Sequence, residues 1–338
     1  MDSELHPEYS LSDEQETRLR PITLQDFLGQ ETVTSNLAVF IRAARSREEA
    51  LDHVFLNGPP GLGKTTLAGI MAHEMAADFR VTSAPALEKP KDLAGILTTL
   101  PPGSVFFIDE IHRLRPVLEE MLYTAMEDFE LDWVIGQGPS ARSVRIPISR
   151  FTLVGATTKA GSVSAPMHSR FGISVRLNLY NDQDIIRILR RSADLMDIPV
   201  SEDALPLLAQ CSRGTPRVAN RILRRMRDFA QVLGDGRINI DSVRHGMKRL
   251  EIDSHGLERH DREILKTIIS HYNGGPVGAE TLAISIGESV DTLEDFYEPY
   301  LIQRGFIQRS PRGRMATPLA YEHLQMELPP DADQRLLF

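Results

Sequence analysis

The sequence predicts an α/β fold in three parts: a parallel-sheet domain, a small all-helical domain and a C-terminal winged-helix domain. Between about residues 24 and 180, short apolar runs alternate with helix-length segments, the pattern of a parallel sheet covered by helices. From residue 181 to about 251 the strand signal disappears, and apolar residues recur at spacings of three and four. Three helical segments and two short strands follow. We therefore expect domains at residues 21–180, 181–251 and 252–338.

Length and composition agree with several domains of a globular protein. The 338 residues are long for one hydrophobic core, and 41% hydrophobic and 25% charged residues are ordinary proportions. The formal net charge of -9 argues against a surface that is basic everywhere, so any nucleic-acid contact must come from a local patch. The single Cys211 rules out an internal disulfide bond and a cysteine-based metal cluster.

The N-terminal segment is acidic. Six of the first 16 residues are Asp or Glu, which predicts a disordered leader over residues 1–20. A secretory signal needs a basic start and an apolar core, and no run of 18 apolar residues suggests a membrane span. We expect a cytoplasmic protein without a membrane contact.

Three apolar runs mark the strands of the first domain. They read "HVFLNG", "SVFFIDE" and "RFTLVGATT", and each ends in small or polar residues. Parallel sheets bind ligands at the carboxyl ends of their strands, so the residues after these runs are expected to meet at one edge.

The first run leads into "GPPGLGKT", residues 58–65, which fits the phosphate-loop pattern G-x-x-x-x-G-K-[ST]. Glycines in such a loop let backbone N–H groups converge on anionic oxygens at a helix N-terminus. Lys64 is expected to reach the β- and γ-phosphates of ATP, and the Thr65 hydroxyl to ligate Mg²⁺. A chance Gly/Pro loop is the alternative, but the eight-residue pattern between a strand and a helix favours nucleotide binding.

The second run delivers Asp109 and Glu110 together. Asp109 is expected to hold Mg²⁺, and Glu110 to orient and deprotonate the attacking water. Two acids after a strand also suit a helix N-cap. The phosphate loop about 45 residues earlier favours catalysis.

Three further candidates carry weaker signals. Thr157 and Thr158 end the third run, where a hydroxyl either senses the γ-phosphate or forms a turn. Arg170 in "HSRFG" is either an arginine finger or an ordinary salt-bridged residue. Arg217 lies just inside a predicted helix start, and it either reaches the phosphates or belongs to a solvated basic face.

The C-terminal part has the pattern of a winged helix. "REILKTIISHY", "GAETLAISIG" and "VDTLEDFYEPYLIQRG" predict helices, and "FIQRSPRGRMAT" predicts two short strands around a Pro-Arg-Gly turn. Between Gln303 and Met315 there are four arginines and no acid, a local charge that favours DNA.

These parts, in this order and spacing, resemble the AAA+ ATPases, which usually act as hexameric rings. The resemblance is most specific for the RuvB family, the branch-migration motors of bacterial Holliday junctions, and covers roughly residues 18–322. The segments that carry it are "LRPITLQDFLGQ", "GPPGLGKTTLA", "FIDEIHRL", "GATTKAG", "RFGI", "SRGTPR", "GGPVGAETLA" and "EPYLIQRGFIQRSPRGRMAT".

The resemblance implies an ATP- and Mg²⁺-dependent motor that acts as a homohexamer on double-stranded DNA at Holliday junctions, with RuvA and RuvC as partners. It implies Asp109 and Glu110 as the Walker B acids, Thr158 as sensor 1, and Arg170 as the finger that reaches the neighbouring subunit's nucleotide. The residues that it implies around the nucleotide and its metal are Leu19, Arg20, Gly61, Lys64, Thr65, Thr66, Asp109, Glu127, Asp128, Phe129, Arg170, Tyr180 and Arg217. On the wing it implies DNA contacts by Arg309 and Arg314, with Arg312 at the turn between them.

Two segments depart from the family pattern. Lys159 stands where arginine is common, and His168 and Ser169 stand where an Arg-Asp pair is frequent. Both changes leave Thr158 and Arg170 in place, so they bear only on the packing around the finger.

Residues 130–148 read as two alternating strands around a Gly-Pro turn. The resemblance implies that this hairpin docks RuvA, and Trp133, Val134 and Ile135 would otherwise be costly to expose. The alternative is a hairpin that only borders the sheet.

Two other classes of function remain open on these residues. A protein-remodelling ATPase usually carries an aromatic pore loop and lacks a wing, whereas a clamp loader or replication initiator uses hydrolysis to reset a DNA-bound complex. Salt-dependent DNA affinity with DNA-stimulated hydrolysis separates a DNA motor from the first class. Junction unwinding with a partner separates it from the second.

Overall fold

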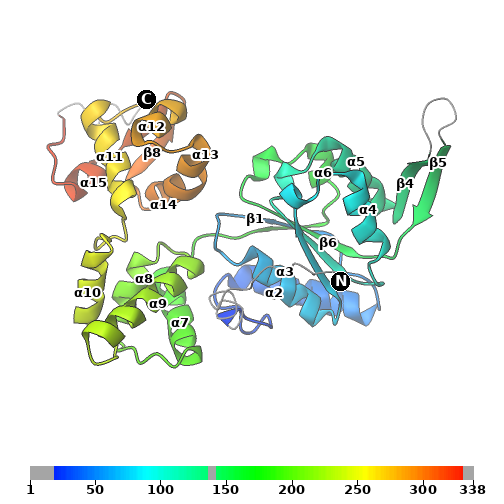
Figure 1. Ribbon diagram of the computed structural model, residues 1–338, viewed down its shortest axis with the longest axis horizontal. Coiled ribbons are helices and arrows are strands. Elements are labelled where there is room, and N and C mark those ends of the chain that lie inside the picture. The colour runs from blue at the N-terminus through cyan, green and yellow to red at the C-terminus, as the bar shows by residue number, and fades with distance from the viewer. Residues whose placement is uncertain (1–18, 136–141, 330–338) are drawn as a thin grey trace, which may run out of the picture. The chain divides into compact units, whose positions relative to one another are not determined.

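The computed structural model describes residues 19–135 and 142–329. Within these ranges the chain forms two compact units, one of residues 19–58 and 62–178 and the other of residues 59–61 and 179–329. Figure 1 draws the first unit in blue to green and the second in green to red. The predicted leader at 1–20 falls almost entirely outside the described residues, as does the predicted turn of the 130–148 hairpin.

A five-stranded, entirely parallel sheet is the centre of the first unit, with strand order β2-β3-β6-β1-β7. Its strands are β1 (Val54–Asn57), β2 (Phe79–Ser83), β3 (Val105–Asp109), β6 (Thr152–Thr157) and β7 (Ile173–Arg176). The three predicted strands are confirmed as β1, β3 and β6, and β7 follows shortly after Arg170. Strand β2 was not predicted, because an edge strand is largely exposed and lacks a continuous apolar run.

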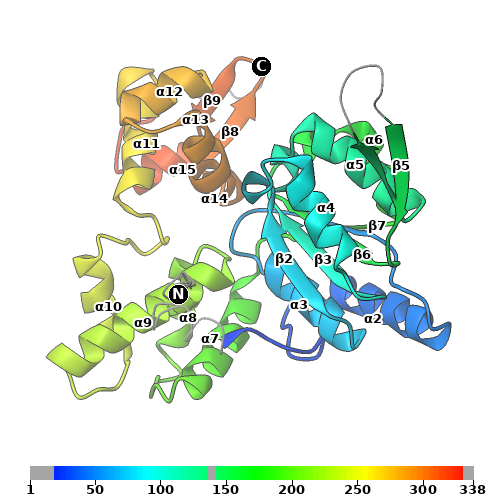
Figure 2. The ribbon, with the colours of Figure 1, turned by 45° about the vertical axis from the view of Figure 1, so that its right-hand side comes forward.

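Helices cover both faces of this sheet. They are α2 (Glu31–Ser46), α3 (Lys64–Glu74), α4 (Pro90–Thr98), α5 (Pro116–Glu127) and α6 (Ala165–His168), with short 3₁₀ turns η1 (Ala84–Ala86), η2 (Ile111–Arg113) and η4 (Ala160–Ser162). Helix α3 lies on one face and α4, α5 and α6 lie on the other, as Figures 1 and 2 show and as right-handed crossovers between these strands require. The core between α4, α5 and the sheet includes Phe106, Leu118 and Leu122, all fully buried.

An antiparallel hairpin of β4 (Glu130–Ile135) and β5 (Arg142–Pro147) projects from the first unit (Figure 1). These are the two predicted strands. Leu131 is fully buried at the root of the hairpin, and Trp133 packs partly against the same core. Val144, which lies opposite Trp133, is 41% exposed. The predicted exposure of Trp133 is therefore only partial.

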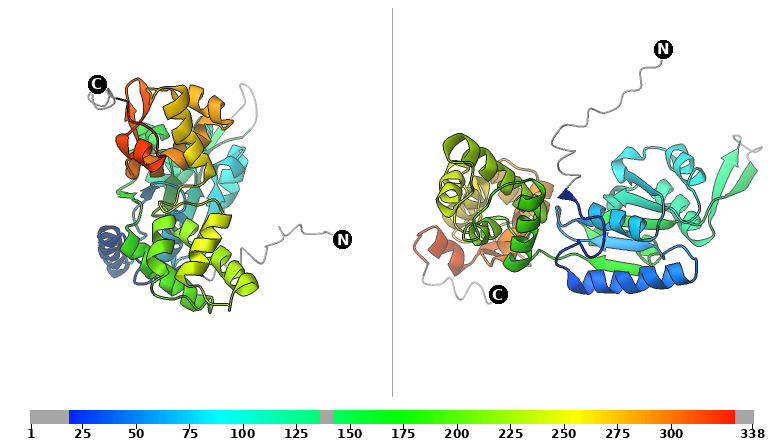
Figure 3. Two further views of the ribbon diagram at one scale, coloured as in Figure 1. Left: turned by 90° about the vertical axis from the view of Figure 1, so that its left-hand side faces the viewer. Right: turned by 90° about the horizontal axis from the view of Figure 1, so that it is seen from below.

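The second unit begins with a helical bundle, drawn in green to yellow in Figure 3. Its helices are α7 (Asp182–Leu195), α8 (Leu205–Cys211), α9 (Pro216–Leu233) and α10 (Ile240–Arg249). Asn181 caps α7 by accepting the Asp184 N–H, and Asn239 caps α10 in the same way through Ser242. A Cβ on Gly246 would lie 2.5 Å from Met226 Sδ, so glycine is needed for the close packing of α10 on α9.

A winged helix completes the second unit. It contains α11 (Arg259–His271), α12 (Ala279–Ile286), α13 (Val290–Thr292), a π-helical turn η5 (Leu293–Tyr297), α14 (Glu298–Gln303), β8 (Ile307–Ser310), β9 (Gly313–Ala316) and α15 (Pro318–His323). The segment predicted as one helix at 290–305 is thus three consecutive helical pieces. A separate core with Leu265, Ile268, Leu301 and Phe306 holds these elements together.

Across residues 19–135 and 142–329, no helix has both the length and the apolar character that a membrane span requires.

Candidate nucleotide-binding and catalytic site

The phosphate loop joins the end of β1 to the start of α3. Gly58, Gly61 and Gly63 have φ angles of 144°, 79° and 97°, where side chains are strained. A Cβ on Gly58 would lie 2.4 Å from the Leu177 carbonyl oxygen, and one on Gly63 would lie 3.2 Å from the Phe27 ring. No side chain caps the start of α3. The loop therefore offers the glycine-lined helix N-terminus that a phosphate group requires.

Lys64 occupies the centre of this site. Its side chain is buried, and Nζ donates a hydrogen bond of 2.8 Å to the Gly58 carbonyl oxygen. Burial lowers the pKa of Lys64, and the negative charges of Asp109 and Glu110 act against that shift. Thr65 follows in the first turn of α3 and is half-buried, as is Thr66. The structure thus brings the predicted lysine together with both predicted carboxylates.

Asp109 ends β3, and Glu110 begins the turn that follows. Asp109 Oδ1 accepts the Glu110 N–H at 3.0 Å, and the Glu110 backbone is left-handed with φ of 53°. This turn directs the chain away from the sheet while both carboxylates stay half-buried at its carboxyl edge. Glu110 is the N-cap residue of the turn η2 that follows, but its side chain forms no cap hydrogen bond.

The two threonines at the end of β6 have different surroundings. Thr157 is fully buried, its Oγ1 lies 2.8 Å from His112 Nδ1, and it accepts the Lys159 N–H at 2.9 Å. Thr158 is half-buried just past the strand. His112 Nε2 in turn lies 3.5 Å from Glu110 Oε2. Sequence reasoning missed His112, although it stands two residues after Glu110 in the quoted motif.

Arg170 is held on the first unit by several partners. Its Nη1 donates to the Pro166 carbonyl oxygen at 2.7 Å, and its Nη2 lies 3.1 Å from Glu127 Oε2. The guanidinium carbon lies 4.4 Å from the centre of the Tyr123 ring. Nε is buried and has no hydrogen-bond partner. Tyr123 was not predicted, and Glu127, predicted near nucleotide, contacts Arg170.

The other predicted residues of the first unit differ in exposure. Leu19 is buried and Arg20 is exposed. Asp128 is exposed, whereas Phe129 is half-buried and packs against the rings of His53 and Phe151.

The residues that depart from the family pattern fit the local packing. The His168 ring meets the ring of Phe55 edge-on at 4.9 Å, and Ser169 Oγ donates to the Pro166 carbonyl oxygen.

Tyr180 and Arg217 belong to the second unit, together with loop residues 59–61. The Tyr180 ring is buried, and its N–H donates to the Gly214 carbonyl oxygen. Arg217 is exposed, and its N–H lies 3.4 Å from the Gly61 carbonyl oxygen. A Cβ on Gly61 would lie 2.8 Å from Thr215 Cγ2, so glycine is required where the loop meets the start of α9.

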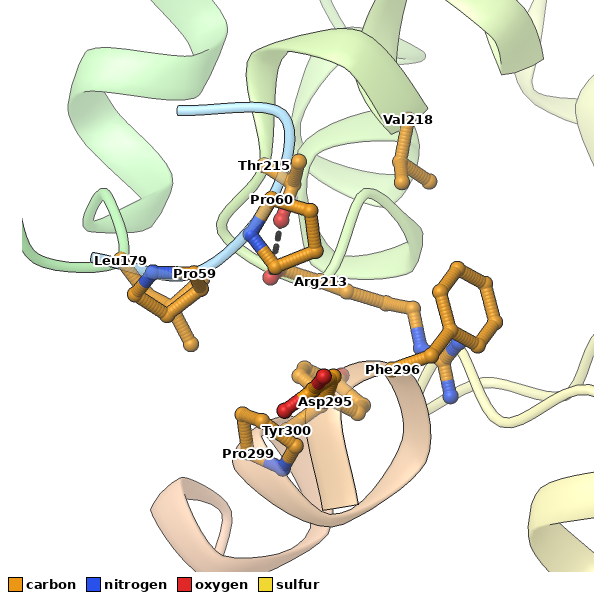
Figure 4. A pocket seen from close by; sticks show the side chains of 10 residues that line it. All are labelled: Pro59, Pro60, Leu179, Arg213, Thr215, Val218, Asp295, Phe296, Pro299 and Tyr300. Atoms are coloured by element: carbon orange, nitrogen blue, oxygen red, sulfur yellow. Dashed lines mark hydrogen bonds between the residues drawn. The ribbon is translucent and has the colours of Figure 1, made fainter. Parts of the chain in front are cut away.

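A pocket of about 50 Å³ lies in the second unit (Figure 4). It is lined by Pro59, Pro60, Leu179, Arg213, Thr215, Val218, Asp295, Phe296, Pro299 and Tyr300. Its volume is far below the roughly 300 Å³ at which ligand pockets begin. Beside it, Arg213 forms a buried ion pair with Asp261 of the winged helix and stacks over the Tyr300 ring at 4.8 Å. The pocket is therefore a packing gap rather than the nucleotide site.

The wing arginines are paired with acids. Arg309 and Arg314 lie directly opposite each other on β8 and β9. Both bind Glu298, whose carboxylate is fully buried, and Arg314 also binds Glu294. Sequence reasoning missed these acids, although a spacing of four places both on one helical face. The positive charge of the wing is consequently smaller than predicted. Arg312 is exposed at the turn, and no ion pair is recorded for it among the described residues.

Comparison with known proteins extends over nearly the whole described chain. Three family models match: the "Holliday junction DNA helicase RuvB P-loop domain" at residues 19–177, the "RuvB AAA lid domain" at 180–253 and the "RuvB C-terminal winged helix domain" at 254–325. These matches confirm the predicted fold class.

Curated relatives and solved structures agree. The "Holliday junction branch migration complex subunit RuvB" of Treponema denticola is 64% identical over 325 residues, which cover 96% of this chain and 95% of that protein. The subunit of the same name from Borreliella burgdorferi is 57% identical over 331 residues, covering 97% and 95%. The structure of the Thermotoga maritima RuvB Holliday junction branch migration motor is 50% identical with a TM-score of 0.86, covering 92% of this chain and 100% of that chain.

Proposed function

The chain belongs to the RuvB family, and on that premise we propose that it is an ATP-driven motor that moves the branch point of Holliday junctions during DNA recombination and repair. One observation carries the proposal: a phosphate loop with strand-end carboxylates and a winged helix with a basic turn occur in one chain. A protein-remodelling ATPase usually lacks such a winged helix. We further propose the domain limits 21–180, 181–251 and 252–338, and action in the bacterial cytoplasm, where such junctions form.

The residues of the first unit fit ATP hydrolysis. Lys64 and the N–H groups at the start of α3 would bind the phosphates, since the loop is glycine-lined and its helix has no side-chain cap. Thr65 and Asp109 would hold Mg²⁺, an ion that takes one or two protein oxygens and keeps the rest of its shell for water and phosphate. When bound, the metal would neutralise negative charge on the phosphates.

Glu110 would accept the proton of the attacking water. This half-buried residue directly follows Asp109, so one carboxylate can hold the metal while the other acts as the base. Thr158 is the better candidate for a γ-phosphate sensor. The hydroxyl of Thr157 is already engaged by His112 and the Lys159 N–H, whereas Thr158 lies just past the strand.

Arg170 would act on the nucleotide of a neighbouring subunit in a homohexameric ring. Leu19, Arg20, Tyr180 and Arg217 would complete the nucleotide site, and Glu127, Asp128 and Phe129 would lie near a nucleotide as well. In this proposal hydrolysis drives a conformational change, and the wing transmits it to the DNA backbone. RuvA would dock at the β4–β5 hairpin, and RuvC would join the same complex.

A branch-migration assay tests the proposal. The chain, ATP and a synthetic four-way junction are combined with and without RuvA, and separation into duplex arms is measured. We expect ATP-dependent separation that RuvA accelerates. The matched control Glu110→Gln should bind ATP yet hydrolyse it about 10²- to 10⁴-fold more slowly and fail to separate junctions. DNA-stimulated hydrolysis without any junction movement, even with RuvA, would point to a clamp-loader or initiator function instead.

A further inference from the structure

His112 lies between the carboxyl ends of two neighbouring strands. It sits in the turn η2 after β3, and its partner Thr157 ends β6, which pairs with β3 in the sheet. The imidazole therefore bridges Thr157 Oγ1, 2.8 Å from Nδ1, and Glu110 Oε2, 3.5 Å from Nε2. Its side chain is 11% exposed, so both ring nitrogens face protein groups in a largely dry site.

The groups around Thr157 favour one direction for its hydrogen bond with His112. The Lys159 N–H donates to Thr157 Oγ1, and a hydroxyl that accepts one bond still has its own proton to donate. Donation from Thr157 to Nδ1 makes Nδ1 the acceptor of a neutral imidazole, which leaves the proton on Nε2. That N–H faces the Glu110 carboxylate. With this bond direction, the imidazole is in the tautomer whose Nε2–H can face the Glu110 carboxylate.

Glu110 needs such a restraint. Its backbone is fixed by the left-handed turn and by the hydrogen bond to Asp109, but its side chain is 35% exposed and has several rotatable bonds. A base that must meet one water molecule loses rate when its carboxylate is misplaced by as little as 1 Å.

We propose that His112 is a positioning residue that orients the Glu110 carboxylate for proton acceptance, and that Thr157 sets the tautomer of His112 for this task. The inference rests on the proposed role of Glu110 as the base. It adds a specific contact that joins the end of β6, one residue before Thr158, to the catalytic carboxylate.

Two substitutions of His112 separate its two contacts. His112→Asn keeps an amide near the position of Nδ1 but removes the donor that faces Glu110, whereas His112→Gln places an amide near Nε2 and loses the contact to Thr157. We expect His112→Asn to lower kcat for basal ATP hydrolysis about tenfold to 10²-fold, while the affinity for ATP remains unchanged. His112→Gln should recover part of that loss. A role in folding alone predicts the same effect for both.

Thr157 gives an independent test if His112 variants fold poorly. Thr157→Val removes the hydroxyl with nearly the same shape and should lower kcat, and Thr157→Ser should restore it. In a Glu110→Gln background, His112→Asn should cause no further loss, because the group that it positions is already gone. Wild-type kcat in His112→Asn and Thr157→Val, or a fully additive loss in the Glu110→Gln background, would overturn the proposal.

The assay also separates this inference from the proposed function. Hydrolysis is measured without a junction, so a failure of the wild-type protein to move junctions leaves the His112 result intact. Normal turnover by Glu110→Gln alone would instead remove the premise on which His112 acts.

Discussion

The guanidinium group of Arg170 lies over the ring of Tyr123, with 4.4 Å between the guanidinium carbon and the ring centre. The phenol is fixed in turn, because its hydroxyl lies 2.9 Å from Glu119 Oε2 and 3.1 Å from Ser164 Oγ. A cation over an aromatic face gains about 0.5–1 kcal/mol at exposed sites and more when desolvated. Arg170 is therefore held in one orientation by residues of the first unit alone.

The contact between Arg170 and Tyr123 predicts that the ring of Tyr123, rather than its hydroxyl, orients Arg170 for hydrolysis. Tyr123→Leu should lower kcat for ATP hydrolysis by the assembled ring about tenfold, because the finger loses its orientation while ATP binding is unaffected. Tyr123→Phe keeps the ring and should retain most of the activity. Steady-state hydrolysis at saturating ATP and a nucleotide-binding titration measure the two effects. Equal losses in both variants would assign the role to the hydrogen bonds with Glu119 and Ser164.

Action of Arg170 across a subunit border predicts complementation between inactive variants. Arg170→Ala should bind ATP yet lose hydrolysis by roughly 10³-fold or more, as expected for an arginine finger. Mixing it with Lys64→Ala should restore some hydrolysis, because an intact loop then meets an intact finger. Hydrolysis rates over a range of mixing ratios test this. A flat response in verified mixed rings would contradict trans action.

The hairpin predicts a partner surface at Val144. This side chain is 41% exposed on β5, whereas its cross-strand neighbour Trp133 packs partly on the core. Val144→Ser should reduce RuvA-stimulated hydrolysis and leave basal hydrolysis unchanged. Val232→Ser, the same change at an exposed position on α9, is the matched control. Trp133→Ser should lower thermal stability, since it removes core contacts. Full RuvA stimulation of the Val144 variant would argue that the hairpin only borders the sheet.

The wing predicts different effects for Arg312 and Arg314. Arg312 is exposed, so Arg312→Ala should flatten the slope of log DNA affinity against log salt by about 0.9, the contribution of one phosphate contact. Arg314 is only 12% exposed and neutralises a fully buried carboxylate. Arg314→Ala should therefore destabilise the winged helix by up to about 3 kcal/mol, because the buried Glu298 carboxylate then keeps only Arg309 as a cationic partner.

DNA titrations over a salt series and calorimetric unfolding separate these two effects. An unchanged salt slope in Arg312→Ala would exclude that side chain from the DNA contact. An unchanged unfolding temperature in Arg314→Ala would mean that Arg309 alone satisfies Glu298.

The parts of the fold that depend on local sequence were predictable. Strands β1, β3 and β6 are continuous apolar runs, and the phosphate loop and its carboxylates have fixed spacings. Strand β2 was missed because it is exposed or half-buried along its whole length and mixes apolar with polar residues. The division of the 290–305 segment was missed as well, although Pro299 signals it: proline disrupts a helix interior and suits the first turn of a helix, where it stands in α14.

The partners of the site residues were not predictable, because they depend on tertiary packing. Glu298 meets Arg309 and Arg314 only after the wing folds back on α14, and His112 reaches Thr157 only because β3 and β6 are neighbours. A motif identifies which side chain acts, whereas the contacts that orient or neutralise it come from segments far along the chain.

The buried ion pair between Arg213 and Asp261 has a mechanical consequence. Separating the two would leave an unpaired charge in a dry interior at a cost of about 3–5 kcal/mol. At equilibrium the contact is therefore open in only about one of 10² to 10⁴ molecules. The contact between the helical bundle and the winged helix is therefore rigid rather than a flexible hinge. In the proposed motor, a torque applied at the start of α9, where Arg217 lies four residues after Arg213, would reach the winged helix with little loss, whereas a more flexible contact would absorb part of it.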